Sequence, residues 1–229
     1  MPSTEAILIE KCMKAWRFLY RRGFIEGFGH ISARIPGTDT YMLTRHSLGR
    51  IIVPDDMLVY DASGTQLGGI GDRPGEAPIH HEIYRSRPDV HSIIHYHGMH
   101  ATAFTTTNAH QLKPIHLMGT LFADGLPIYE DPRLVSTTAR GVALAQALGP
   151  YRAALMRAHG SVVTGGDVEE CVTGAFFLEE NAHRAYLACM LGQPIWMDEA
   201  MAKAAAEELI RSRGPIRRVW AMVEVEGLE

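Results

Sequence analysis

The pattern of apolar and polar residues at the start of the chain predicts one helix followed by short strands. Ser3-Thr4 is typical of a helix start, and Gly23 marks its end. Between them apolar residues recur at helical spacing, at Leu8, Cys12, Trp16 and Leu19. Short β-rich segments separated by Gly, Pro, Asp and Ser then predict strands over residues 30–35, 40–44, 50–53 and 57–60.

The rest of the chain mixes the two periodicities. Helices are predicted over residues 77–87, 99–107, 134–148, 168–191 and 198–211, and strands over residues 90–97, 153–157 and 161–164. Residues 113–133 predict an ordered functional loop with a short strand or two, and the residues after about 213 a C-terminal tail. Strands early and helices late predict one α/β domain over residues 1–229, with helices on both faces of a mixed sheet.

Composition narrows the class of protein. The 229 residues are 46% hydrophobic and 21% charged, with a net charge of −4 and no basic stripe, so we expect no nucleic-acid partner. Three cysteines without a CxxC spacing are typical of reduced thiols. The N-terminus lacks the apolar run of a signal peptide, and no apolar stretch reaches 18 residues. We therefore expect a soluble, cytoplasmic protein with no membrane partner.

His95-Tyr96-His97 ends an apolar strand, and Gly98 follows it directly. Residues two apart in a strand project from one face, so the two imidazoles suit one metal ion, such as Zn, Mn, Fe or Co. By itself the motif also fits two half-exposed strand histidines.

Two further residues are candidates for the same site. His159 lies between two predicted strands, and Gly160 after it permits close backbone approach or a positive φ; a turn histidine is the alternative. Glu76 follows Pro74-Gly75 at the start of a predicted helix, where it is a candidate acid/base or a cap favoured by the helix dipole. Sequence spacing cannot show whether it lies near the three histidines.

These motifs together resemble the class II aldolase and adducin family. The segment from Glu76 to Tyr84 is similar to its E-x-x-x-H helix start, and residues 87–97, ending in His95-Tyr96-His97, are similar to its HxH strand. Residues 155–160 around His159 are similar to its third-ligand turn, and Gly29-His30-Ile31-Ser32 to an N-terminal loop that is usually Gly-Asn-x-Ser in the sugar-phosphate aldolases. The resemblance covers roughly residues 5 to 195.

The resemblance implies a three-layer α/β/α fold around a mixed, mostly antiparallel sheet. It also implies a homotetramer with active sites between subunits, and one divalent metal ion (Zn, Mn, Co or Fe) on His95, His97 and His159. Glu76 would then be the proton carrier beside the metal.

Departures from the sugar-phosphate aldolases bear on the substrate. His30 stands where they have asparagine, residues 44–49 read Thr-Arg-His-Ser-Leu-Gly in place of Thr-Pro-Ser-Gly, and Arg73 precedes Pro74-Gly75 where they have Ser-Ser. A phosphate pocket of small hydroxyls and amides has thus become cationic, and arginine forks suit planar carboxylates. This pattern, with Pro114-Ile115-His116, is similar to the branch that decarboxylates hydroxylated aromatic dicarboxylates such as dihydroxyphthalates or a hydroxypyridine dicarboxylate.

On this interpretation the substrate is a small aromatic carboxylate. Arg45 or Arg73 would hold the carboxylate that stays on the ring, with His30 and Ser47 beside it. His116 and Tyr129 are candidates for a second acid/base, although a buried hydrogen-bonding histidine and a core tyrosine are the commoner explanations of such residues.

Three other functions compete with this one. The first is a class II aldolase that cleaves an unphosphorylated hydroxy-carbonyl substrate. The second is a non-haem iron oxygenase, which would need iron and O2. The third is a non-catalytic scaffold like adducin, which predicts the loss of the metal histidines, whereas this chain retains all three and Glu76.

Overall fold

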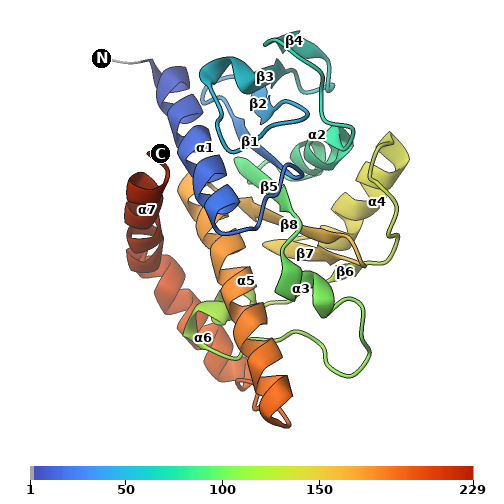
Figure 1. Cartoon of the computed structure of the whole chain (residues 1–229), viewed down its shortest axis with the longest axis vertical. Helices are drawn as coiled ribbons and strands as arrows, with labels where there is room; N and C mark the ends of the chain where they lie inside the picture. Colours follow the sequence, from blue (N-terminus) through green and yellow to red (C-terminus); the bar gives the residue numbers. More distant parts are fainter. Residues whose placement is uncertain (1–2, 229) are drawn as a thin grey trace.

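The computed structural model describes residues 3–228. These residues form one eight-stranded sheet in the order β4-β3-β2-β1-β5-β8-β7-β6 (Figure 1). The strands are β1 (His30–Arg34), β2 (Tyr41–Thr44), β3 (Met57–Tyr60), β4 (Gln66–Gly68), β5 (Ser92–Tyr96), β6 (Ile128–Tyr129), β7 (Ala153–Met156) and β8 (Gly160–Gly165). Within the described chain, β6 and β7 pair in parallel and all other neighbours are antiparallel, which confirms the predicted mixed, mostly antiparallel sheet.

Helices cover both faces of this sheet, which makes three layers. One face carries α2 (Ala77–Ser86) and α4 (Thr138–Leu148), which pack on each other. The long helix α5 (Val168–Leu191) lies on the other face with α1 (Thr4–Arg21), α3 (Met99–Ala103) and α7 (Gly214–Glu226), and α6 (Glu199–Ser212) packs beside them (Figure 1). Two short 3-10 turns, η1 (Pro54–Asp56) and η2 (Leu117–Phe122), complete the fold.

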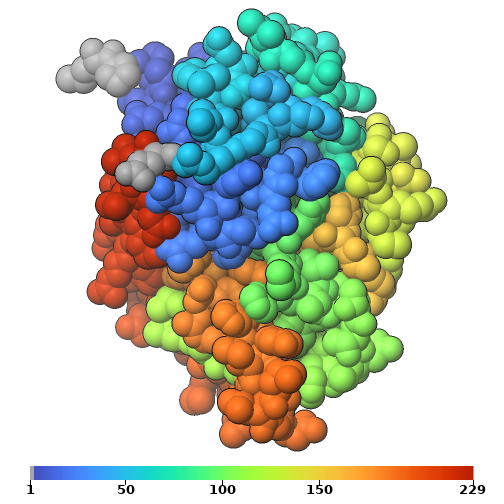
Figure 2. Space-filling model, viewed as in Figure 1, coloured from blue at the N-terminus to red at the C-terminus, as the bar shows by residue number. Residues whose placement is uncertain are grey.

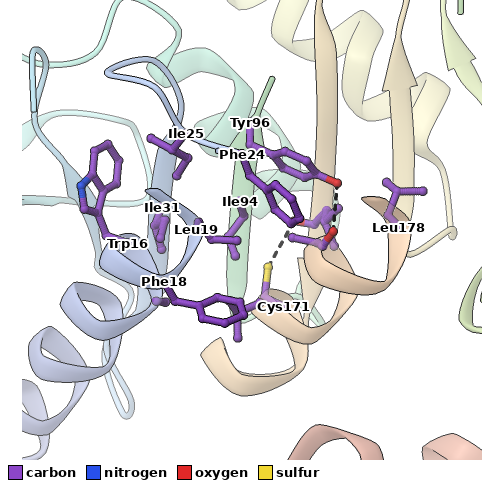
Figure 3. Packing of buried hydrophobic residues seen from close by; sticks show 14 of the residues in the cluster. Trp16, Phe18, Leu19, Phe24, Ile25, Ile31, Ile94, Tyr96, Cys171 and Leu178 are labelled. Atoms are coloured by element: carbon purple, nitrogen blue, oxygen red, sulfur yellow. Dashed lines mark hydrogen bonds between the residues drawn. The ribbon is translucent and has the colours of Figure 1, made fainter. Parts of the chain in front are cut away.

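Successive side chains of a strand point to opposite faces of the sheet, so the buried apolar residues form two clusters, one on each face. In β5, Ile94 and Tyr96 pack in the cluster that includes α1 and α5, whereas Ile93 belongs to the cluster under α2 and α4. Figure 3 shows the first cluster, in which the Tyr96 hydroxyl donates to the carbonyl of Ala175 in α5 at 3.2 Å. His95, between Ile94 and Tyr96, therefore points to the face of α2.

Capping residues in the sequence explain where α1 and α5 begin. Ser3 caps α1 by accepting the N–H of Ala6, and Asp167 caps α5 by accepting the N–H of Glu170. Gly192 ends α5, so this helix covers the range that the sequence predicts.

The end of the chain corrects one prediction. The segment expected to be a tail from about residue 213 forms α7, which packs on α1 and α5. Ile216, Val219 and Val223 are buried, and their helical spacing gives α7 an apolar face. The last residue, 229, lies outside the described residues.

Four other predictions differ from the structure: one strand does not form, two helix boundaries are wrong and one strand was not predicted. Residues 50–53 form no strand; instead the side chains of Trp16 and Arg17 donate to the carbonyls of Gly49 and Ile52. The helix predicted over residues 99–107 stops at Ala103, since the hydroxyl of Thr105 bonds the carbonyl of Thr102. The helix predicted over residues 134–148 begins at Thr138, and β4 was not predicted.

No helix within residues 3–228 is long and apolar enough to cross a bilayer. Figure 2 shows the end of α5, in orange, forming the lower surface of the molecule beside the green segment that follows β5. α3 and α5 pack on each other there.

Candidate metal centre and cavity

Four side chains from three parts of the chain converge at one end of β5. Each of Glu76, His95, His97 and His159 offers one ligand atom, and these atoms lie within 4.8 Å of one another. Glu76 precedes α2, and His159 lies in the turn between β7 and β8. His95 is the penultimate residue of β5, and His97 lies just beyond the end of this strand. The fold thus brings together the four residues that the sequence marks as the centre of the site.

The backbone sets the tautomer of His95. Its Nδ1 lies 3.1 Å from the carbonyl oxygen of Ser161 in the neighbouring strand β8. A carbonyl only accepts, so Nδ1 carries a proton and Nε2 is the nitrogen that faces the cluster, 3.2 Å from Nε2 of His97. A histidine that binds a metal through one ring nitrogen commonly donates the N–H of the other to a carbonyl or a carboxylate, and this bond orients the ring.

The turn that carries His159 depends on two unusual backbone positions. Ala158 has a positive φ of 52°, and its N–H donates to Thr105 Oγ1 at 2.9 Å, which holds this strained residue in place. Gly160 allows close approach, since a Cβ there would lie 2.4 Å from the Tyr96 carbonyl and 2.8 Å from the His97 ring. The sequence predicts either a close backbone approach or a positive φ at Gly160. The structure shows the close approach at Gly160, and the positive φ occurs at Ala158.

Glu76 is buried and anchored by one of its two oxygens. Oε1 accepts the N–H of Val135 at 2.7 Å, whereas Oε2 lies 3.5 Å from Nε2 of both His95 and His159. Burial alone would raise the pKa of Glu76, but the two histidines and the Val135 N–H outweigh it and hold that pKa below its usual range. Glu76 is therefore a carboxylate at neutral pH.

His97 is a neutral imidazole at pH 7. Burial, together with the nearby His95 and His159, lowers the pKa of His97 to about 4. Both ring nitrogens of His159 are buried without a hydrogen-bond partner in the described chain. Unpaired buried nitrogens are costly, and neutral imidazoles with one carboxylate suit a divalent transition-metal ion. The residues present therefore fit such an ion.

A cavity of about 230 Å³ opens beside this cluster and includes Glu76 and His97 in its wall. Trp16, Phe28, Leu48 and Leu134 add apolar surface, and the Phe28 ring lies 6.1 Å from the His97 ring. Phe28 is 70% exposed and Leu134 61% exposed, so they lie at the cavity mouth. The sequence analysis missed these four residues; Phe28, an aromatic residue between Gly27 and Gly29, was the one detectable signal.

Three of the predicted substrate-binding residues, His30, Arg45 and Ser47, also line this cavity. His30 pairs with His95 across β1 and β5, so the two rings stack at 5.6 Å. Asp56 accepts from Arg45 Nε at 2.6 Å and so orients the guanidinium at the cavity wall. Ser47 has a positive φ of 57° and bonds the His46 ring.

The other three predicted residues do not line the cavity of their own chain. Arg73 is exposed and makes no ion pair within the described residues. His116 caps η2 by accepting the N–H of Gly119 on its Nδ1. Tyr129 lies in the edge strand β6, packed in the core cluster under α4. None of the three lines the cavity.

Comparison with known proteins places this geometry in a family. The model of the class II aldolase and adducin N-terminal domain matches residues 10–186. The chain belongs to the class II aldolase and adducin family. Class II aldolases use a divalent metal, in agreement with the Glu/His cluster, and membership in this family supports a lyase.

Individual relatives agree with this assignment. The chain is 30% identical over 192 residues to 3,4-dihydroxyphthalate decarboxylase from Arthrobacter keyseri, covering 78% of this chain and 77% of the relative. Among solved structures, an aldolase II superfamily protein from Pseudomonas syringae matches with a TM-score of 0.87 at 20% identity, over 99% of this chain and 94% of that one. L-fuculose 1-phosphate aldolase from Glaciozyma antarctica matches with a TM-score of 0.81 at 22% identity, over 100% and 96%.

Proposed function

We propose that this class II aldolase family member is a divalent-metal-dependent, non-oxidative decarboxylase of a hydroxylated aromatic dicarboxylate, such as a dihydroxyphthalate or a hydroxypyridine dicarboxylate. One observation carries the proposal: the cluster of Glu76, His95, His97 and His159 adjoins a cavity with apolar walls and the guanidinium of Arg45. Such walls suit a flat ring, and the guanidinium suits a carboxylate. The 3,4-dihydroxyphthalate decarboxylase relative supports the same substrate class.

In this proposal His95, His97 and His159 would hold one divalent ion, and their donor set suits Zn, Mn, Co or Fe. When bound, the ion supplies Lewis-acid stabilisation of negative charge on the substrate oxygens. Arg45 holds the carboxylate that stays on the ring, His30 and Ser47 lie beside it, and Phe28 and Leu134 limit the access of water.

Glu76 moves the proton in the proposed reaction. It starts as a carboxylate, so it first accepts the proton of the hydroxyl group ortho to the departing carboxylate. It then delivers that proton to the ring carbon that bears this carboxylate. The carbon–carboxylate bond breaks, its electron pair restores the aromatic ring, and CO2 leaves. The anchor to Val135 keeps Oε1 fixed while Oε2 exchanges the proton.

The proposed function includes an oligomer, because some of the candidate residues do not line the cavity of their own chain. We infer a homotetramer with sites between subunits, supported by the exposed apolar residues Phe28 and Leu134 at the cavity mouth. His116 and Tyr129 do not line the cavity of their own chain, so a role as second acid/base requires a neighbouring copy to bring them there. A substrate-binding role for Arg73 would likewise require a neighbouring copy to bring it to the cavity. The proposed location is the cytoplasm, where Cys12, Cys171 and Cys189 would remain unpaired thiols.

A class II aldolase acting on an unphosphorylated substrate is the second candidate. The match to a fuculose phosphate aldolase over the whole chain supports it by fold alone. Both reactions leave an electron pair on a carbon beside an oxygen-bearing carbon, so the same cluster serves either one.

The test is anaerobic CO2 release by protein that has been stripped of metal and reloaded with Mn2+, Co2+ or Zn2+. The substrates are a panel of ortho-hydroxylated aromatic and pyridine dicarboxylates. We expect release that His95→Ala and His159→Ala abolish and that His183→Ala, outside the cluster, preserves. No release from the panel, with aldehyde formed from hydroxy-ketones instead, would overturn the decarboxylase in favour of the aldolase.

A further inference from the structure

A buried carboxylate from α5 binds the segment that follows β5. Glu179 is 4% exposed, and its Oε1 accepts the backbone N–H of His100 at 2.6 Å. The ring of His100 lies beside the same oxygen, with Nδ1 at 3.1 Å, and Oε2 accepts the N–H of Ala101 at 3.2 Å. Both carboxylate oxygens are therefore engaged by the first turn of α3, which lies 78 and 79 residues earlier in the sequence.

The local sequence leaves this turn of α3 without a cap of its own. The helix is five residues long, and its N-cap is Gly98, which has no side chain to accept the N–H groups of the first turn. Burying a carboxylate is unfavourable unless hydrogen bonds offset the loss of water, and Glu179 receives such bonds here. An apolar side chain in its place would leave the buried N–H of Ala101 without this acceptor. The carboxylate and the start of α3 therefore stabilise each other.

The same carboxylate determines where the chain passes after His97. Gly98 is the one residue between His97 and α3. A Cβ at Gly98 would collide with Glu179 Oε2 and would lie 2.7 Å from the Tyr96 ring, so Glu179 packs directly against the Gly98 backbone. One turn earlier in α5, the carbonyl of Ala175 accepts the Tyr96 hydroxyl (Figure 3). α5 therefore holds both the residue before His97 and the residues after it.

His97 depends on such support more than His95 does. His95 lies within β5, where it pairs with residues of both neighbouring strands, and its ring is bonded to the carbonyl of Ser161. β5 ends at Tyr96, so His97 lies beyond the strand, and its N–H donates to the carbonyl of Phe24 at 3.2 Å. The position of His97 thus rests on that bond and on the path of the chain into α3.

We propose that Glu179 is a positioning residue for the metal centre. By binding the first turn of α3, it fixes the backbone that presents His97 to the metal ion. Glu179 is not one of the four residues of the cluster, so it acts through the chain between His97 and His100. This role rests on the metal-binding part of the proposed function, but it does not depend on which substrate or which reaction the metal ion serves.

The test is a titration of metal-free protein with Co2+, read by the visible absorption of the bound ion. Glu179→Gln keeps the shape of the side chain but replaces one acceptor oxygen by an NH2 group, which cannot accept an N–H from α3. We expect Kd for Co2+ to rise about 10- to 100-fold, with an altered absorption spectrum of the bound ion. Glu180→Gln is the matched control, because Glu180 pairs with Arg184 in α5, outside this contact. Its Kd should equal that of the wild type.

A double-mutant cycle with His97→Ala separates positioning from a general loss of stability. If Glu179 acts through His97, adding Glu179→Gln to His97→Ala should raise Kd by less than about twofold, since the positioned ligand is already gone. Equal losses of affinity in the two backgrounds would overturn the proposal, and so would a Kd that Glu179→Gln leaves unchanged. If Glu179→Gln does not fold, Glu179→Asp, which shortens the side chain, takes its place in the same cycle with the same expected outcomes.

Metal titrations need no substrate, so the role of Glu179 and the proposed decarboxylation are decided separately. Absence of CO2 release from every substrate, together with a Co2+ affinity that depends on Glu179 through His97, would refute the decarboxylase and support the positioning role. CO2 release by a protein whose Co2+ affinity does not depend on Glu179 would refute the positioning role alone.

Discussion

Glu76 Oε1 accepts the backbone N–H of Val135 at 2.7 Å, across 59 residues of sequence. This bond ties the start of α2 to the segment before α4 and leaves Oε2 facing His95 and His159. The anchor and the proposed proton transfer therefore use different oxygens of one carboxylate.

Glu76→Gln separates these two tasks, since glutamine can still accept from Val135 but cannot carry the proton. We expect kcat for CO2 release to fall about 10²- to 10⁴-fold, the usual contribution of a general acid/base, while metal content stays close to that of the wild type. Rates and metal content would be measured on the same preparations. Glu82→Gln, at a buried glutamate that pairs with Arg85 in α2, is the matched control. Full activity in Glu76→Gln would contradict the assigned role.

Removal of a metal ligand is expected to abolish both binding and activity. Chelation of the wild type should stop CO2 release, and Mn2+, Co2+ or Zn2+ should restore it and raise Tm, because a ligand that binds the folded state stabilises it. In His159→Ala the same ions should leave Tm unchanged. His183→Ala, in α5 and outside the cluster, should respond like the wild type. A metal-dependent rise of Tm in His159→Ala as large as that of the wild type would exclude this residue as a ligand.

Gly160→Ala is expected to disturb the metal centre through the backbone. The added Cβ would lie 2.4 Å from the Tyr96 carbonyl and 2.8 Å from the His97 ring, so the turn or the ring must move. We expect metal affinity to fall about 10- to 100-fold, the range found when the supports of a ligand are lost. Gly49→Ala is the control, because a Cβ there has no neighbour within 4 Å. Equal metal affinities of Gly160→Ala and Gly49→Ala in titrations would show that metal binding does not depend on the close approach at Gly160.

Arg45→Met tests the carboxylate-binding role. Loss of a hydrogen bond to a charged group should raise KM for a dicarboxylate about 10- to 100-fold, with a smaller effect on kcat. Arg45→Lys should recover only part of this, since an ammonium cannot form a bidentate pair. Arg73→Met should change KM less, because Arg73 does not line the cavity of its own chain. A larger KM effect in Arg73→Met would assign the role to Arg73 in an assembled protein.

Acid should destabilise the metal-free protein through the half-buried His81. Burial lowers the pKa of His81 to about 4 from a usual value of 6.5. As pH falls from about 6.5 to 4, the unfolded chain binds a proton that the folded chain does not, so the free energy of unfolding falls. In urea titrations at pH 7, 6 and 5, His81→Gln should lessen this slope by up to about 1.4 kcal/mol per pH unit. His91→Gln, at an exposed histidine, is the control, and equal slopes in both variants would contradict the assignment.

The sequence by itself determined the local elements and the residue types of the site. Helical periodicity with Asp167 and Gly192 at its ends defined α5, and strand alternation placed His95 and His97 as a pair. The predicted boundaries of helices and strands were wrong where contacts between distant parts of the chain override the local preference for a helix or a strand. Residues 50–53 are bonded by side chains of α1, and the segment around Val135 is held by Glu76 before α4 begins.

Only the tertiary structure decided which of the candidate residues share one cavity. The turn at His159 meets the end of β5 because β8 pairs with β5, a contact across more than sixty residues that periodicity cannot encode. Pairing of β1 with β5 likewise stacks His30 on His95, while Arg73, His116 and Tyr129 fall elsewhere. Spacing along a chain sets which face a side chain takes, but the strand order of the sheet sets which faces meet.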